Sequence, residues 1–243
     1  MPFSLKKKVA EACITTSLCY GSETWLTVNF KRLESLYGKL VRLLLGVRQS
    51  IPMDLCLFEA SMPCIKEMIL SRRKTFLEKA LANNPNTPLG KAWALISGLN
   101  SKAFQSFANS VEIVSDKTES LIRASDKSRF STFLDLNPTL VHHPVYTSTV
   151  PDTLRLAITR LLLSSHNFKV ETGRWTRPIT PREARHCPIC KTIEDEIHVI
   201  LVCPKTLPVR TKYNFSATNF ADFFTMDPLQ CAKFTNDIMQ MYD

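Results

Sequence analysis

The feature that most restricts how this chain can fold is a group of Cys and His residues in its last third. Two residues separate Cys187 from Cys190, seven separate Cys190 from His198, and four separate His198 from Cys203. Thiolate and imidazole are the usual ligands of tetrahedral zinc, and two cysteines at this spacing can hold one ion from a tight turn. The spacing therefore predicts one structural Zn2+, with all four positions filled by protein and none open to water.

The two halves of this site are expected on different elements. Pro188 favours a turn between the first two cysteines, whereas apolar residues recur at helical spacing around His198. We expect His198 in a short helix, Cys203 at or just beyond its end, and Pro204 as the residue that stops it. Metal binding would then contribute directly to the folding of this segment.

Other cysteines and histidines fit the metal site less well. His186 is a competing ligand, but it adjoins Cys187 and would strain the site. The cysteines without ligand spacing are interpreted as core or incidental residues; they are Cys13, Cys19, Cys56, Cys64 and Cys231. With no secretory signal and no stretch near the roughly 20 apolar residues that span a bilayer, we expect an intracellular protein of the nucleus or cytoplasm, without a membrane partner.

Few Gly residues and little alternation of apolar with polar residues favour helices over strands, so the fold class is mainly α. A helical bundle followed by a zinc-knuckle region with little strand is predicted. Helices are expected over residues 4–18, 28–45, 52–63, 64–82, 89–97, 101–111, 117–134, 152–163 and 229–242, with a short strand over 168–171. Gly46 should end the second helix.

A loop rich in Asn and Pro, at residues 83–88, is the best candidate for a domain boundary. Four regions are predicted: a helical region over 1–83, a helical linker over 84–150, a zinc-knuckle domain over 151–210, and a helical tail over 211–243.

The net charge is +9, which is compatible with an acidic partner. The surplus is concentrated early, because residues 1–80 hold 13 Lys/Arg against 7 Asp/Glu. Basic residues of the second helix are candidates for contacts with nucleic-acid phosphates: Lys31, Arg32, Lys39 and Arg42. The alternative for each is a solvated face.

Basic and aromatic residues also flank the predicted knuckle, a combination typical of single-stranded RNA recognition. The candidates are His166, Lys169, Arg174, Trp175, Arg177, Arg182 and Arg185. Trp175 either stacks on a base or plugs a small core, and His166 either contacts RNA or caps the preceding helix. The acidic run 194–196 is expected on a surface away from nucleic acid, or paired with Arg182 or Arg185.

Several motifs resemble the C-terminal region of LINE-type (non-LTR) retrotransposon reverse transcriptases. They are the runs 164–175, 181–183, 187–190, 194–198 and 203–204. The run 19–25, followed by Leu33-Glu34 and Leu45-Gly46, is similar to the same family just after its polymerase palm, where the chain forms a helical thumb. The resemblance covers both ends of the chain and leaves a less distinctive middle.

This resemblance implies a thumb that packs against a primer–template duplex and a zinc segment that holds element RNA or target DNA. The family's catalytic aspartates lie on the palm, and this chain has no Asp-Asp pair. Two-metal nucleotidyl transfer needs clustered carboxylates, so we expect a non-catalytic nucleic-acid-binding fragment. Two alternatives remain: part of an active RNA-directed DNA polymerase whose palm lies upstream, and a decayed or domesticated zinc-stabilised protein-interaction module.

Overall fold

The computed structural model describes residues 1–25, 29–82, 86–98, 102, 105, 118–216 and 219–243. Within these residues the protein is mainly helical, as predicted, and the strand pairing is an isolated antiparallel bridge between His186 and Ile193. The α-helices are α1 (Phe3–Val9), α2 (Thr16–Leu18), α3 (Phe30–Leu45), α4 (Met53–Ala60), α5 (Ile65–Ala82), α6 (Pro88–Gly98), α8 (Thr118–Arg123), α9 (Ser128–Leu136), α10 (Asp152–Leu162), α11 (Lys169–Thr172), α12 (Leu207–Lys212), α13 (Ala221–Thr225) and α14 (Pro228–Gln240).

Short turns of tighter or wider helix join these elements. Turns of 3-10 helix cover Ser22–Thr24, Pro144–Tyr146, Arg182–Ala184 and Pro204–Thr206. Turns of π-helix cover Ala10–Thr15 and His198–Val202. The second π-helical turn contains a predicted metal ligand, and such turns are frequent at functional sites.

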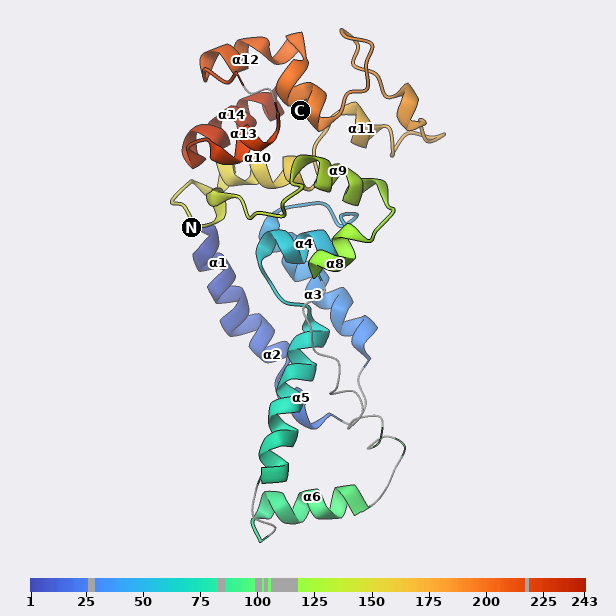
Figure 1. The fold of residues 1–243 in the computed structure, drawn as a ribbon, viewed down its shortest axis with the longest axis vertical. Helices are drawn as coiled ribbons and strands as arrows, with labels where there is room; N and C mark the ends of the chain where they lie inside the picture. Colours follow the sequence, from blue (N-terminus) through green and yellow to red (C-terminus); the bar gives the residue numbers. More distant parts are fainter. Residues whose placement is uncertain (26–28, 83–85, 99–101, 103–104, 106–117, 217–218) are drawn as a thin grey trace.

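The helices stack into an elongated body (Figure 1). At one end α14 packs against α10 and α12, and in the middle α4 packs between α3 and α8. From there α5 leads away to α6 at the opposite end (Figure 1). Among the helices of the described residues, none has the length and apolar character needed to cross a bilayer.

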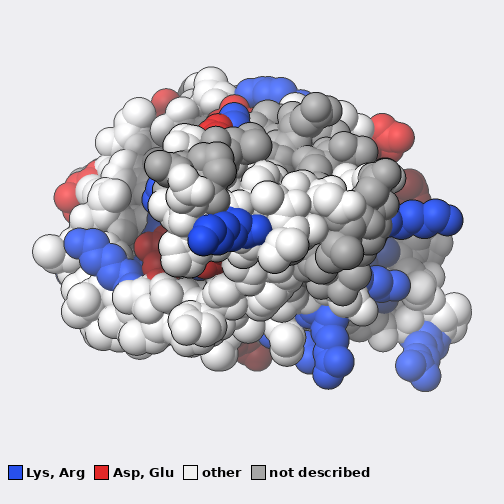
Figure 2. All heavy atoms as spheres, turned by 90° about the horizontal axis from the view of Figure 1, so that it is seen from below, with Lys and Arg blue, Asp and Glu red and all other residues white. Residues whose placement is uncertain are grey.

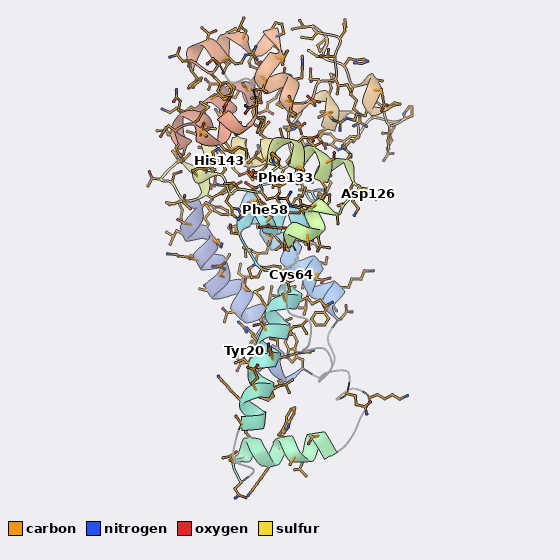
Figure 3. The ribbon with its side chains drawn as sticks, viewed as in Figure 1. Tyr20, Phe58, Cys64, Asp126, Phe133 and His143 are labelled. Atoms are coloured by element: carbon orange, nitrogen blue, oxygen red, sulfur yellow. The ribbon has the colours of Figure 1, made fainter. Side chains whose placement is uncertain are left out.

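Apolar side chains from distant parts of the chain share a core. Phe58 of α4 meets Phe133 of α9 edge to face, with ring centroids 5.8 Å apart, and His142 stacks on Phe58 at 4.5 Å. Phe58 and Phe133 lie together between α4 and α9 in Figure 3. Full burial of such a ring stabilises the fold by about 1.5–3 kcal/mol. One buried cluster draws residues from all four predicted regions, so the proposed domain boundaries stay a prediction.

The predicted stop at Gly46 is confirmed. Tyr37, Val41 and Leu45 form the buried stripe of α3, spaced four residues apart. Gly46 then adopts φ 71°, and its N–H donates to Arg42 O at 2.9 Å. Glycine tolerates this left-handed conformation, which closes the helix.

Two expectations for local structure differ from the fold, and a third lies mostly outside the described residues. The expected strand over 168–171 is instead the short helix α11, Lys169–Thr172. The N–H groups of Glu171 and Thr172 donate to Phe168 O, and those of Lys169 and Val170 donate to Glu194, so no ladder to a strand of the described residues forms. The single helix expected over 117–134 is two helices, α8 and α9, which lets Ile122 and Phe130 both reach the core. The helix expected over 101–111 lies outside the described residues, apart from 102 and 105.

The first helix turns a different side to the core than its pattern indicates. Leu5 and Val9 recur at helical spacing with Ala12, Cys13 and Thr16, a pattern that predicts a buried apolar side, yet Leu5 and Val9 are 48% and 47% exposed. Phe3 and Ala10 are buried instead, and the π-helical turn that follows shifts the buried face toward Thr15. An apolar stripe therefore faces outward on α1.

One buried carboxyl group has no hydrogen-bonding partner among the described residues. Glu59 of α4 is 1% exposed, and neither of its carboxylate oxygens is paired. Burial raises its pKa from 4.5 to about 7, and Tyr146 and Arg155 only partly offset this effect. Because the folded protein favours the protonated form, Glu59 binds more protons when folded than when unfolded between these two pH values.

Gly46→Ala is expected to destabilise the fold by roughly 2–4 kcal/mol, since it combines left-handed strain with overpacking. An added Cβ would lie 2.3 Å from Leu156 Cδ2. Urea unfolding followed by circular dichroism measures the change. Gly98→Ala is the matched control, because its Cβ would meet nothing within 4 Å and should cost no stability. Equal stability of the two variants would contradict the packing described.

Glu59→Gln is expected to stabilise the protein at pH 8 by about 2–3 kcal/mol, because it removes a buried charge. The gain should shrink as the pH falls from about 7 to 4.5, where the wild-type carboxyl is protonated in the folded state. Urea unfolding at each pH measures the difference between the two proteins. Glu78→Gln, at an exposed position of α5, should show no such pH-dependent gain.

Candidate metal centre and basic segment

The fold brings together the four predicted metal ligands. One ligand atom from each of Cys187, Cys190, His198 and Cys203 lies within 4.8 Å of all the others. The Cys203 sulfur is 3.8 Å from that of Cys187 and 3.9 Å from that of Cys190. Tetrahedral bonds of 2.3 Å would separate two sulfurs by about 3.8 Å. The cluster can therefore hold one metal ion.

A tight turn presents the first two ligands. The N–H of Cys187 donates to Thr192 O at 2.7 Å, and the N–H of Lys191 donates to Cys187 O at 3.0 Å. Lys191 adopts φ 58°, an uncommon conformation for a residue with a side chain. These bonds and the bridge between His186 and Ile193 fix the loop that carries both sulfurs.

His198 is placed by the second element, the π-helical turn His198–Val202, and Cys203 follows directly, as predicted. Within the described chain, His198 Nε2 is buried without a hydrogen-bonding partner, and Nδ1 lies 3.2 Å from Thr192 Oγ1. A buried unpaired polar atom costs about 1–3 kcal/mol. Metal ligation through Nε2 would remove that cost, while Thr192 Oγ1 would accept a hydrogen bond from the Nδ1–H group and hold the ring in place.

Arg210 of α12 holds the backbone of the ligand Cys203, a role that the sequence did not indicate. Its Nη2 donates to Cys203 O at 2.8 Å, and its Nη1 donates to Thr206 Oγ1 at 2.8 Å. The Cys203 N–H donates to His198 O at 2.8 Å. Arg210 is 9% exposed and comes from a separate helix, so no spacing rule connects it with the cluster.

The electrostatics of the thiols also favour a cation. Burial opposes ionisation of Cys187, but the N–H groups of Cys190 and Ile189 and the neighbouring thiols hold its pKa below the usual value. Burial, together with the sulfurs of Cys203 and Cys187, raises the pKa of Cys190 to about 11. Three thiolates at this separation repel one another, and a bound metal ion would neutralise that repulsion.

The acidic run beside the cluster is mostly buried, so the expectation of a surface position was wrong for two of its residues. Glu194 Oε1 accepts from the Lys169 N–H at 2.9 Å, and Glu194 O accepts from the Val170 N–H at 3.1 Å. Glu196 Oε1 lies 2.6 Å from Ser164 Oγ and 2.9 Å from His166 Nε2. Both carboxylates join the metal segment to residues 164–170.

Asp195 follows the expectation of a pair with Arg182. Its Oδ2 lies 3.9 Å from Arg182 Nη2, and its Oδ1 accepts from the His198 N–H at 2.9 Å. The second bond satisfies a free donor at the start of the helical turn that carries His198. Asp195 therefore positions a ligand in addition to its weak surface ion pair.

Three of the predicted nucleic-acid contacts serve the fold. His166 is buried, with its ring stacked on Phe168 at 4.0 Å. Arg185 is also buried and donates to Val170 O at 2.6 Å. Arg174 Nε donates to Glu171 Oε1 at 2.7 Å. Because His166 and Arg185 are enclosed, this fold does not present them to a nucleic acid.

Trp175 is 45% exposed, so its interpretation as a core plug was wrong. The Arg48 guanidinium stacks on the indole, 3.9 Å from the ring centroid. Arg48 also donates to His166 O at 2.9 Å and to Asn167 Oδ1 at 2.7 Å. Sequence reasoning missed Arg48, which fixes the chain before Trp175 although it lies far away in the sequence.

The other predicted contacts divide by exposure. Lys169, Arg177, Lys31, Arg32 and Lys39 are exposed, while Arg182 and Arg42 are partly buried. At the α6 end of the molecule, Lys and Arg side chains are scattered among uncharged surface, with more of them on one side (Figure 2). That end shows no continuous basic patch among its described residues, so the segment around Trp175 is the better candidate surface.

No family model matches this chain, and neither a curated protein nor a solved structure matches it. Membership of the LINE-type family therefore stays a prediction from motifs.

The geometry predicts that each chain binds one metal ion, and that Cys190→Ser weakens binding at least tenfold by removing a thiolate. Titration of the reduced protein with Co2+, followed by competition with Zn2+, measures stoichiometry and affinity by absorbance. His186→Ala is the control, because this exposed histidine lies beside Cys187 but outside the cluster. Unchanged affinity of Cys190→Ser, or loss of binding in His186→Ala, would contradict the ligand assignment.

Proposed function

We propose that this chain is a zinc-stabilised nucleic-acid-binding module, the C-terminal part of a LINE-type reverse transcriptase. The observation that carries the proposal is the half-exposed Trp175 between Lys169 and Arg177, on a segment bonded to the metal loop. A ring that stacks on a base, with cations that follow the backbone, is the usual means of binding single strands.

The metal segment would give this surface its rigidity. Glu194 belongs to the chain between the ligands Cys190 and His198, and it holds the start of α11 through its carboxylate and its carbonyl. Trp175 follows α11 after a short turn, and Arg48 covers its ring. A surface fixed before binding loses less conformational entropy when it meets a strand.

Zinc is the proposed metal because three thiolates and one imidazole suit it, and because the protein fills four tetrahedral positions. A site closed in this way organises the fold and leaves no place for a metal-bound water. We therefore assign the chain a binding role. Polymerisation would require a palm upstream, and that palm is the proposed protein partner in an intracellular, RNA- and DNA-containing complex.

Support for the family comes from the placement of its motifs. Residues 164–175 and 194–198 resemble the family, and in this fold they contact each other through Glu194 and Glu196. The run 187–190, which also resembles it, meets 194–198 at the metal cluster, where Cys187 and Cys190 lie beside His198. Motifs that pack together are more readily explained by shared descent of one structural unit than by separate coincidences.

Wild-type protein is expected to bind labelled single-stranded RNA, with an affinity that falls steeply as salt rises. Trp175→Ala should weaken binding by about 1–3 kcal/mol, and Trp175→Phe should retain most of it, because a ring still stacks. Fluorescence anisotropy across a salt series measures both effects, with duplex DNA as a second ligand.

Lys169→Ala should remove about one phosphate contact. The slope of the logarithm of RNA affinity against the logarithm of salt concentration, called here the salt slope, should therefore become less steep by about one. Lys74→Ala, on the exposed face of α5, is the charge-matched control and should leave the slope unchanged. Undetectable binding by the wild type at low salt, or equal affinities of Trp175→Ala and Trp175→Phe, would sink the proposal.

The exposed stripe on the first helical segment favours a second candidate, a protein-interaction module. Leu5, Val9 and Ile14 are 48%, 47% and 44% exposed, so the segment presents three apolar side chains to solvent. In that case the zinc site would only stabilise the fold, and the same anisotropy series would show no RNA binding.

A further inference from the structure

A second group of basic residues lines a pocket that includes Arg174, the residue directly before Trp175. A hollow of about 400 Å3 is lined by the cations Arg42, Lys127, Arg129 and Arg174, together with Gln49 and Ser50. Arg42 comes from α3 and Arg174 follows α11, so residues far apart in the sequence converge here. The sequence suggested phosphate contacts for both of them separately, but it gave no sign that they share one pocket.

A buried carboxylate holds two of these cations in place. Glu171 is 1% exposed, its Oε2 accepts from Arg129 Nη2 at 2.7 Å, and its Oε1 accepts from Arg174 Nε at 2.7 Å. Arg129 Nη1 also donates to Ser50 O at 2.7 Å, and Arg174 Nη2 donates to Ser128 Oγ at 3.0 Å. Both guanidinium groups are therefore fixed by the protein before any ligand arrives.

The remaining cations leave the pocket strongly positive. Arg42 donates through Nε to Ile51 O at 2.9 Å, and within the described chain its two Nη groups have no hydrogen-bonding partner. Lys127 is exposed. Four cations against the single carboxylate of Glu171 leave a local net charge of +3. Like charges this close destabilise the free protein, and an anion would offset that cost.

The local backbone adds to this potential. α9 begins beside the pocket, and the residue before it, Lys127, provides no side-chain cap. The first turn of α9 contains no acidic residue, so the positive end of the helix dipole is not neutralised. The nearest acid in the sequence, Asp126, lies at the outer edge of the loop between α8 and α9 (Figure 3) and does not line the pocket.

We infer that this pocket binds one phosphate group, with Arg42, Lys127 and Arg174 as its donors. Guanidinium and ammonium groups that converge from several elements suit a tetrahedral anion with several acceptor oxygens. The backbone of a nucleic-acid strand is the source of that phosphate. This last identification rests on the proposed function, whereas the anion site itself rests on the pocket.

Titrations with two ligands test the anion site and the nucleic-acid assignment separately. The ligands are inorganic phosphate and a single-stranded RNA oligonucleotide. Calorimetric titration with phosphate should show one site on the wild type, and affinity at least tenfold lower in Lys127→Gln and in Arg42→Gln. With RNA, each variant should lower the salt slope by about one. Lys91→Gln, an exposed lysine on α6 at the far end of the molecule, should match the wild type with both ligands (Figure 1).

Arg42→Lys keeps the charge and should restore phosphate binding in part, which distinguishes a lost anion contact from a lost fold. One outcome would overturn the phosphate site but leave the proposed function standing. In that outcome the wild type binds RNA, and both Gln variants keep the wild-type phosphate affinity and the wild-type salt dependence of RNA binding. The opposite outcome is phosphate binding that depends on Lys127 and Arg42, together with no RNA binding. It would overturn the proposed function and the assignment of the phosphate to a nucleic acid, while the anion site would stand.

Discussion

Three sulfurs and one imidazole nitrogen gathered within 4.8 Å are the constraint on which the surrounding chain depends. Around this cluster the chain has one isolated bridge and short helical turns among its described residues. The Thr192 carbonyl holds the Cys187 N–H and the Arg210 guanidinium holds the Cys203 carbonyl, but these bonds cannot neutralise the sulfurs or satisfy the buried nitrogen of His198. A cation would do both, so we expect metal binding and the folding of this segment to be thermodynamically coupled.

Buried carboxylates connect the metal segment, and the chain beside it, to other parts of the molecule. Glu194 fixes the start of α11, Glu196 binds Ser164 and His166, and Glu171 holds Arg129 and Arg174. Each carboxylate is almost fully enclosed. Glu171 and Glu196 each have two hydrogen bonds through the carboxylate and Glu194 has one, and these bonds offset the cost of burial. The candidate single-strand surface and the basic pocket therefore share a support made of charged side chains rather than apolar ones.

The sequence was informative where a local rule applies. The ligand set follows from spacing, the end of α3 follows from Gly46, and the helical class follows from periodicity and from the scarcity of glycine. These features depend on residues close together in the chain, so pattern alone could reveal them.

The sequence did not predict the features that depend on contacts between residues far apart in the chain. Residues 168–171 resemble a strand, but within the described part of the chain no neighbouring strand pairs with them. Trp175 was interpreted as a core plug, but it is half exposed, and its ring is covered by Arg48 from the turn after α3. Glu194 and Glu196 looked like surface acids, because nothing nearby in the sequence indicates the donors that they meet. Arg210 was missed for the same reason.

The turn after α3 has a consequence for how the chain reaches its native state. The Arg48 N–H donates to Ser165 Oγ at 3.1 Å, across 117 positions of sequence. At translation speeds of about 5–20 residues per second, this bond must wait roughly 6–23 s after Arg48 is made. During that interval the end of α3 lacks its final neighbours, and α10 has yet to cover it. The early helices are thus completed by the later chain, and folding of the two halves is expected to be mutually dependent rather than sequential.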